Sequence, residues 1–82
     1  MKILLVAYAM YSEVFPENPF SYEVQEGITA SKLMDRLAED FQEVAGLLPY
    51  TRLAHEQDYL DREAVLKANE EYCLIPPVSG GS

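Results

Sequence analysis

Residues 3–10, with the sequence ILLVAYAM, are apolar without interruption, and this run constrains the fold more than any other segment. An apolar run of this length, with no alternation of polar residues, is typical of a β-strand that is covered on both faces. Such a strand lies in the middle of its sheet rather than at an edge. We therefore expect the chain to build its sheet around this segment.

The next segments predict a turn and a second strand. Residues 15–19 (FPENP) contain two prolines and an asparagine, which favour a turn. In residues 20–26 (FSYEVQE) apolar side chains alternate with polar ones, and Gly27 follows. This alternation is typical of a strand with one exposed face.

Residues 29–41 predict one amphipathic helix. Apolar residues recur at helical spacing along this segment, and the charged residues fall largely on its other face. Thr29 is a suitable N-cap, because its hydroxyl can accept a hydrogen bond from an amide of the first turn. We expect this helix to close the core, with a further turn that extends through Val44 and Leu47.

The last third of the chain predicts short strands. Residues 51–61 (TRLAHEQDYLD) favour a strand, a polar turn near 56–58 and a second short strand. Asn69 tolerates the left-handed conformation of a tight turn, and residues 71–75 (EYCLI) predict the final strand. This order of elements predicts an α+β fold with one helix packed on one face of a mixed sheet.

Size and charge limit the possible functions. The chain has 82 residues, 49% of them hydrophobic, which suits one domain with a modest core. Its formal net charge is −8, from 14 acidic and 6 basic residues. Such a chain repels phosphate backbones and anionic lipids, so nucleic-acid and membrane-surface binding are disfavoured. The acidity favours solubility, or attraction to a basic partner surface.

Residues suited to catalysis or metal binding are sparse. His55 is the single histidine and Cys73 the single cysteine, so the sequence has no His or Cys cluster for a metal ion. We interpret His55 as structural or solvent-exposed, and Cys73 as a small buried residue of a strand. No glycine-rich loop precedes the helix to hold a phosphate. The chain is therefore not expected to be an enzyme by itself.

Residues 76–82 are expected to form an extended tail beyond a folded domain of residues 1–75. Two prolines begin the tail, Val78 supplies an apolar anchor, and two glycines remove the side chains near its end. Six extended residues span at most about 20 Å. A tail of this kind can thread a narrow channel in another protein and present a C-terminal carboxylate to chemistry there.

A carboxylate becomes an acyl donor when it is joined to AMP as a mixed anhydride. Sulfide can then replace AMP and leave a C-terminal thiocarboxylate, whose sulfur is nucleophilic. The carrier itself needs no catalytic side chain for these steps. This chemistry accounts for a functional tail on a domain without catalytic residues.

The tail and the order of elements resemble the family of molybdopterin synthase small subunits, which are ubiquitin-like (β-grasp) sulfur carriers of about this length. The resemblance covers nearly the whole chain and is strongest in LAHEQDYL (53–60) and LKANEEYCLIPPVSGG (66–81). It implies a β-grasp fold with a mixed sheet, one main helix on one face, and an extended C-terminal tail. It also implies that the first and last strands are parallel neighbours in the sheet centre.

The resemblance further implies the site residues and the partners. Gly81 is expected to be adenylated by a ubiquitin-activating-type enzyme that uses ATP, and then converted to the thiocarboxylate. The large subunit of molybdopterin synthase is the expected partner, and no cofactor is expected to stay bound to the carrier. The expected partner-binding residues are Ile75, Pro76, Pro77, Val78, Ser79 and Gly80.

Two alternatives stay open. The chain can be a sulfur carrier of another pathway or a ubiquitin-like protein modifier, or it can be a β-grasp binding module whose tail is never activated. Ser82 follows Gly81, and a sulfur carrier needs Gly81 as its terminus, so we expect Ser82 to be removed before function. The apolar run before Ala7 is too short for a signal peptide, and the expected location is the cytoplasm.

Overall fold

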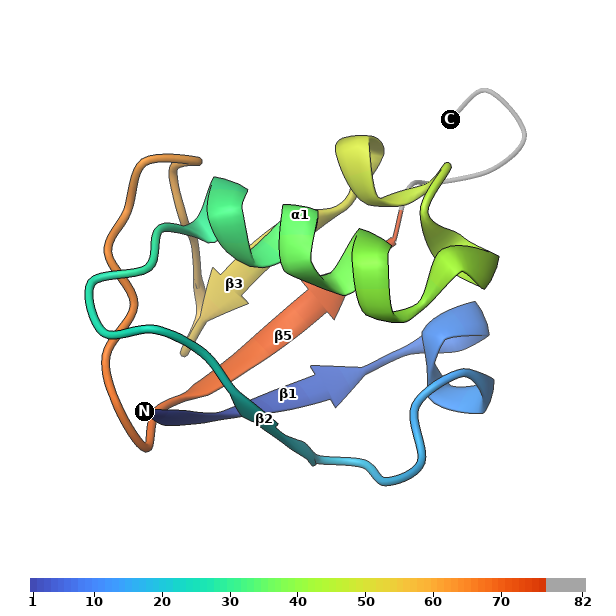
Figure 1. Cartoon of the computed structure of the whole chain (residues 1–82), viewed down its shortest axis with the longest axis horizontal. Coiled ribbons are helices and arrows are strands. Elements are labelled where there is room, and N and C mark those ends of the chain that lie inside the picture. The colour runs from blue at the N-terminus through green and yellow to red at the C-terminus, as the bar shows by residue number, and fades with distance from the viewer. Residues whose placement is uncertain (77–82) are drawn as a thin grey trace.

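The five strands form one mixed sheet, in the order β2-β1-β5-β3-β4, and a single α-helix lies across one of its faces (Figure 1). The computed structural model describes residues 1–76, apart from the side chains of Ala9 and Met10. The elements are β1 (Lys2–Ala7), the 3-10 helix η1 (Ala9–Glu13), β2 (Phe20–Glu23), α1 (Ala30–Asp40), the 3-10 helices η2 (Gln42–Val44) and η3 (Leu48–Tyr50), β3 (Arg52–His55), β4 (Asp58–Tyr59) and β5 (Glu71–Ile75).

β1 occupies the interior of the sheet, as the apolar run at 3–10 predicts. It pairs with β2 in the antiparallel sense and with β5 in the parallel sense. This connectivity, with α1 between the two strand pairs, is that of the β-grasp fold, so the expected fold class is confirmed. No helix among residues 1–76 is long and apolar enough to cross a membrane.

The expectation that β1 is covered on both faces is wrong. Ile3, Leu5 and Ala7 are buried beneath α1, whereas Leu4 and Val6 face the other side of the sheet and are only half-buried. The described part of the chain places no helix on that second face (Figure 1). The apolar run also ends earlier than predicted as a strand, because η1 begins at Ala9.

Helix α1 begins and packs as the sequence predicts. The Thr29 hydroxyl accepts a hydrogen bond from the Lys32 amide at 3.3 Å, so Thr29 is the N-cap. Leu33 and Leu37 are fully buried against the sheet, and both belong to the main hydrophobic core. The helix therefore closes the core and leaves its charged face to solvent.

Short 3-10 helices replace the single extra turn expected after α1. Val44 and Leu48, in η2 and η3, are buried in the core. The Tyr11 hydroxyl is hydrogen-bonded to the Thr51 hydroxyl, which also donates to the Leu47 carbonyl at 2.9 Å. This buried link joins η1 to the segment between η3 and β3.

Two turns of the last third lie where the sequence predicts them, and Asn69 has the left-handed backbone expected of it. Glu56 has φ 59° in the turn between β3 and β4, and Asn69 has φ 64° in the turn before β5. The Asn69 amide donates to the Lys2 carbonyl, and the Leu4 amide donates to the Glu70 carbonyl. These two bonds fix the start of β5 beside β1 and so set the register of the central parallel pair.

Candidate functional site

The predicted tail, residues 76–82, begins where β5 ends, and the structure describes only its first residue. Ile75 is the last residue of β5, and Pro76 is the last described residue; both are half-buried. Five predicted site residues lie outside the described residues: Pro77, Val78, Ser79, Gly80 and Gly81. The roles assigned to these residues, and the boundary between domain and tail, stay predictions.

An apolar row crosses the sheet face that α1 does not cover. Side chains of β5 alternate, so that Tyr72 and Leu74 enter the core while Cys73 and Ile75 face outward. We call this outward side the outer sheet face. Its central row is set by the strand register and consists of Val6, Cys73, Ala54 and Tyr59.

A shallow hollow of about 370 Å³ lies in the outer sheet face next to Ile75. Tyr8 and Tyr59 are among its lining residues, and their side chains are 50% and 57% exposed. Large aromatic side chains at the surface cost solvation and often mark an interface with another protein. Tyr8, Tyr59 and Ile75 together place apolar surface next to the start of the tail. The lining residues are Tyr8, Ala54, Glu56, Gln57, Tyr59, Cys73 and Ile75.

The environment of Tyr8 at the hollow raises the pKa of its hydroxyl. A hydrogen bond between the Tyr8 hydroxyl and Cys73 raises the pKa of Tyr8, and the Cys73 thiol, burial and the Glu71 carboxylate act in the same direction. Tyr8 therefore stays a neutral phenol at physiological pH. It can donate a hydrogen bond to a partner from the rim of the hollow.

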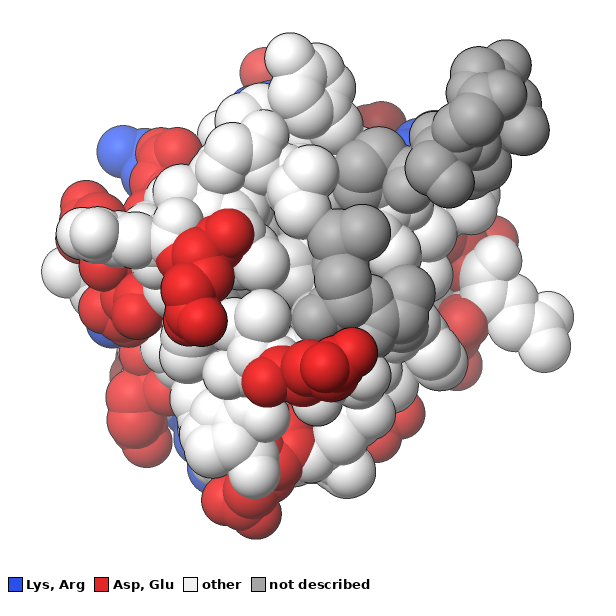
Figure 2. All heavy atoms as spheres, turned by 90° about the vertical axis from the view of Figure 1, so that its right-hand side faces the viewer, with Lys and Arg blue, Asp and Glu red and all other residues white. Residues whose placement is uncertain are grey.

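Charge is distributed unevenly around the hollow. The Arg52 guanidinium lies over the Tyr59 ring at 4.2 Å from the ring centroid, a cation–π contact at the edge of the outer sheet face. At the end of the molecule toward which β1 and β5 run, most of the visible charged side chains are acidic (Figure 2). This acidity favours an approaching partner with a basic surface.

His55, the single histidine, is held by contacts within the described part of the chain. His55 is half-buried, its Nε2 atom lies 2.7 Å from Glu70 Oε1, and its ring packs on Tyr72, in agreement with a structural role. No group of three or more His, Cys, Asp or Glu residues that could hold a metal ion occurs within residues 1–76. The geometry there suits a non-covalent contact.

Sequence reasoning missed most of the outer sheet face. Cys73 was expected to be buried, but it is half-buried and faces outward, because alternation along β5 buries its neighbours Tyr72 and Leu74 instead. Tyr8, Ala54 and Tyr59 were not predicted to lie near Ile75. Their proximity depends on how the strands pair. The one sequence feature that could have indicated this face is the presence of apolar residues at the outward-facing positions of residues 71–75.

Comparisons with known proteins agree with this architecture. A sequence model described as the ThiS family matches residues 11–81, so the chain belongs to the ThiS family, whose members are small ubiquitin-like sulfur carriers. A protein of Dictyostelium discoideum named molybdopterin synthase sulfur carrier subunit is 31% identical over 83 residues, covering 98% of this chain and 94% of that one. A protein of Drosophila melanogaster with the same name is 36% identical over 62 residues, covering 72% of this chain and 68% of that one.

Solved structures share the fold. A putative molybdopterin converting factor subunit 1 from Pyrococcus furiosus superposes with a TM-score of 0.81 at 15% identity, covering 95% of this chain and 99% of that one. SAMP1 from Haloferax volcanii gives a TM-score of 0.75 at 19% identity, covering 99% of this chain and 100% of that one. A ubiquitin from Caldiarchaeum subterraneum gives 0.65 at 20% identity, covering 99% and 98%. These likenesses establish the ubiquitin-like fold.

Proposed function

We propose that the chain carries sulfur as a thiocarboxylate on Gly81 and delivers it to the large subunit of a molybdopterin synthase for dithiolene formation. The observation that carries this proposal is the position of Ile75. It ends β5 beside the apolar hollow of the outer sheet face, and the sequence PPVSGG follows directly. The names of the relatives that match over most of the chain support the same assignment.

The chemistry requires activation of a free glycine carboxylate. A Gly81 carboxylate oxygen attacks the α-phosphorus of ATP, pyrophosphate leaves, and an acyl adenylate forms. Hydrosulfide then attacks the acyl carbon and AMP leaves, which places one sulfur where one carboxylate oxygen had been. After the sulfur passes to the pterin precursor, water restores the carboxylate. A ubiquitin-activating-type enzyme holds the ATP, so the carrier keeps no permanent cofactor.

The domain supplies the binding energy and the tail supplies the reacting atom. The hollow beside Ile75 takes an apolar group of the partner, and Tyr8 offers a hydroxyl at its rim. Pro76 and the four residues that follow it, Pro77, Val78, Ser79 and Gly80, lie in the partner's channel. Glycine at the end of this segment lets the channel walls approach the backbone closely.

A reconstitution separates this function from its alternatives. Purified chain that ends at Gly81 and carries the thiocarboxylate is mixed with a molybdopterin synthase large subunit and cyclic pyranopterin monophosphate. The expected result is molybdopterin formation, with one thiocarboxylate consumed for each sulfur inserted. The matched control is the same chain with an ordinary Gly81 carboxylate, which forms no product.

Three results contradict the proposal in different ways. No molybdopterin from the thiocarboxylated chain, with a large subunit that is active with its own carrier, indicates a sulfur carrier of another pathway. Isopeptide-linked adducts of the chain on cellular proteins indicate a ubiquitin-like modifier. A C-terminus that is never activated in cells indicates a binding module.

A further inference from the structure

The side chain of Asn18 binds the last residue of β1 on the side that faces β2. The Asn18 side-chain amide donates to the Ala7 carbonyl at 2.9 Å, and the Asn18 side-chain oxygen accepts from the Ala7 amide at 3.1 Å. The two residues are 11 positions apart in the sequence. One side chain therefore holds both backbone groups of Ala7, as a residue of a neighbouring antiparallel strand does.

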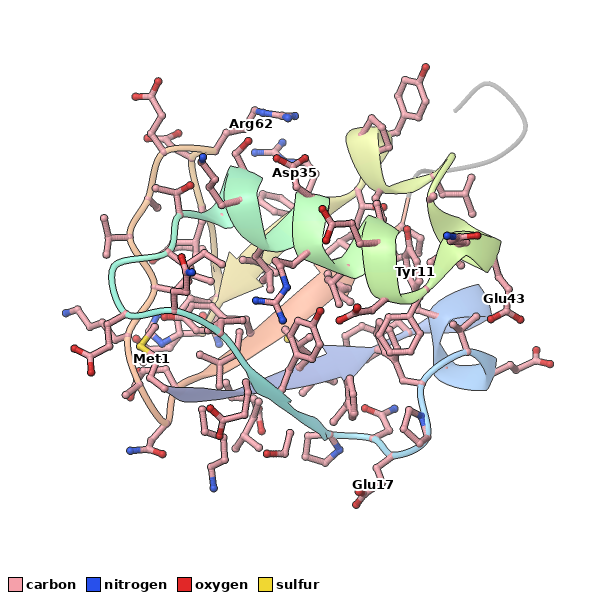
Figure 3. The ribbon with its side chains drawn as sticks, viewed as in Figure 1. Met1, Tyr11, Glu17, Asp35, Glu43 and Arg62 are labelled. Atoms are coloured by element: carbon pink, nitrogen blue, oxygen red, sulfur yellow. The ribbon has the colours of Figure 1, made fainter. Side chains whose placement is uncertain are left out.

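This contact continues the pairing of β1 and β2 beyond its last backbone pair. Leu5 of β1 is the register partner of Phe20, the first residue of β2. Two residues further along, the same register places Ala7 opposite Asn18. β2 has not begun at that point, so the Asn18 side chain takes the place of a backbone partner. In Figure 3 the neighbouring Glu17 points away from the sheet, so the contact belongs to Asn18.

The residue that follows Ala7 lines the hollow beside the base of the tail. Tyr8 still has an extended backbone, with φ −122° and ψ 159°, and η1 begins one residue later. Because side chains alternate along a strand, Tyr8 lies on the outer sheet face with Val6, while Ala7 is buried in the core. The Tyr8 hydroxyl is hydrogen-bonded to Cys73. The Asn18 contact is thus the last one on the β2 side of β1 before Tyr8.

Pairing on the other side of β1 ends at the same residue. Ala7 and Leu74 form the last register pair of β1 and β5 within the described part of the chain. Ala7 is therefore held from both sides, and Tyr8 is the first residue that leaves the sheet. Without the Asn18 contact the end of β1 is held by β5 alone, and the Tyr8 ring loses part of its support.

We propose that Asn18 is a positioning residue for partner binding, because its hold on Ala7 fixes the Tyr8 ring at the rim of the hollow beside Ile75. The inference rests on the proposed function, since it takes this hollow as the surface that meets the large subunit. Asn18 does not line the hollow, so its effect passes through Tyr8. An aromatic ring that is already in place loses little conformational entropy when a partner binds.

The test measures by calorimetry the affinity of the chain that ends at Gly81 for a molybdopterin synthase large subunit. Asn18→Ala should weaken binding about fivefold, which is within the range of couplings between neighbouring residues. In a Tyr8→Ala background the same substitution should have no further effect, because no ring is left to position. Thr29→Ala is the matched control. It removes the hydroxyl that caps α1, so it should lower the free energy of unfolding and leave the affinity unchanged.

A second measurement follows Tyr8 in the absence of a partner. The hydrogen bond to Cys73 raises the pKa of Tyr8 above its ordinary value of 10.0. A residue-resolved NMR titration of the tyrosine rings should show that this pKa falls toward 10.0 in Asn18→Ala. The pKa of Tyr8 should not change in Thr29→Ala, because a loss of stability alone does not move the ring.

Three results overturn the inference. They are wild-type affinity in a folded Asn18→Ala variant, an equal loss of affinity with and without the Tyr8 ring, and an unchanged pKa of Tyr8 in Asn18→Ala. If Asn18→Ala does not fold, Asn18→Asp replaces it, because the carboxylate still accepts from the Ala7 amide and only the donor to the Ala7 carbonyl is lost. Its added negative charge favours a basic partner, so weaker binding then comes from the lost donor, and unchanged binding overturns the inference.

The same experiment distinguishes this inference from the proposed function. If the wild-type chain binds the large subunit and the variants behave alike, only the role of Asn18 is contradicted. If the wild-type chain does not bind a large subunit that is active with its own carrier, the proposed function fails, and the role of Asn18 fails with it.

Discussion

Arg52 of β3 and Ile75 of β5 are register partners in the antiparallel pair that ends at the base of the tail. Arg52 also stacks over Tyr59, so a charged side chain borders the apolar hollow where the chain leaves the sheet. The relationship places the exit of the tail, an apolar hollow and a guanidinium within one small area. Partner binding there should depend on Ile75 more than on other exposed apolar residues.

The first prediction therefore concerns Ile75. Ile75→Ala should weaken binding to the large subunit about tenfold, because interface energy concentrates in a few central apolar residues. The variant should stay folded, since Ile75 is only half-buried. The control is Val65→Ala, which removes an exposed valine that does not line the hollow. Calorimetry measures both affinities, and equal losses in the two variants contradict the assigned role of Ile75.

The second prediction concerns the net charge of −8. Electrostatic attraction to a basic partner accelerates association and is screened by salt. The association rate constant with the large subunit, measured by stopped flow, should fall steeply as the ionic strength rises. The dissociation rate constant should change much less, because apolar contacts govern it. An association rate that does not respond to salt means that the acidity serves solubility alone.

The third prediction concerns the buried pair Tyr11 and Thr51. The Thr51 hydroxyl donates to the Leu47 carbonyl, so the Tyr11 hydroxyl is the donor in the bond between the two side chains. Thr51→Val leaves the Tyr11 hydroxyl buried without a partner and should cost about 1–3 kcal/mol of unfolding free energy. Tyr11→Phe leaves the Thr51–Leu47 bond in place and should cost less. Urea denaturation measures both, and the reverse order contradicts this assignment.

The fourth prediction concerns alkaline pH. Burial and the hydrogen bond to Asp40 raise the pKa of Tyr22 above its ordinary value of 10.0. Below pH 10 both the folded and the unfolded states hold the Tyr22 proton, so this group adds no pH dependence to the free energy of unfolding. Above pH 10 the unfolded state ionises first, and the free energy of unfolding should fall as the pH rises toward the folded pKa.

Tyr22→Phe provides the control for that fall. The variant should lose the part of the alkaline slope that belongs to Tyr22, while Tyr8 and Tyr11, whose pKa values are also raised, keep the rest. Denaturation at a series of pH values between neutrality and pH 11 measures both slopes. Identical slopes for the two proteins contradict the ionisation difference at Tyr22.

Local sequence patterns predicted the elements of this fold well. The interior position of β1, the Thr29 cap, the helix, the turns at Glu56 and Asn69 and the strand 71–75 all follow from short-range periodicity and backbone preference. The prediction that both faces of β1 are covered did not follow from these patterns and is wrong. An apolar run does not distinguish a strand covered by the same chain on both faces from a strand whose second face is covered by another protein. In both cases the same side chains are removed from water.

The candidate site combines residues that the sequence motif predicts with residues that only the tertiary structure brings together. Ile75 and Pro76 were identified from a contiguous motif. Ala54 lies in β3, Tyr59 lies in β4 and Tyr8 directly follows β1, so these residues meet Ile75 only through the pairing of the strands. Single-sequence patterns hold no information on such pairings.

The most direct measurement is the intact mass of the chain after incubation with a cognate activating enzyme, ATP and a sulfur donor. The chain that ends at Gly81 should gain the mass difference between sulfur and oxygen, and a fragment spectrum should place it on Gly81. The chain that ends at Ser82 should gain nothing, because Gly81 then has no free carboxylate. No gain by the Gly81 form, with an enzyme that activates its own carrier, contradicts the sulfur-carrier function. Equal gain by an uncleaved Ser82 form contradicts the assignment of Gly81 as the reacting residue.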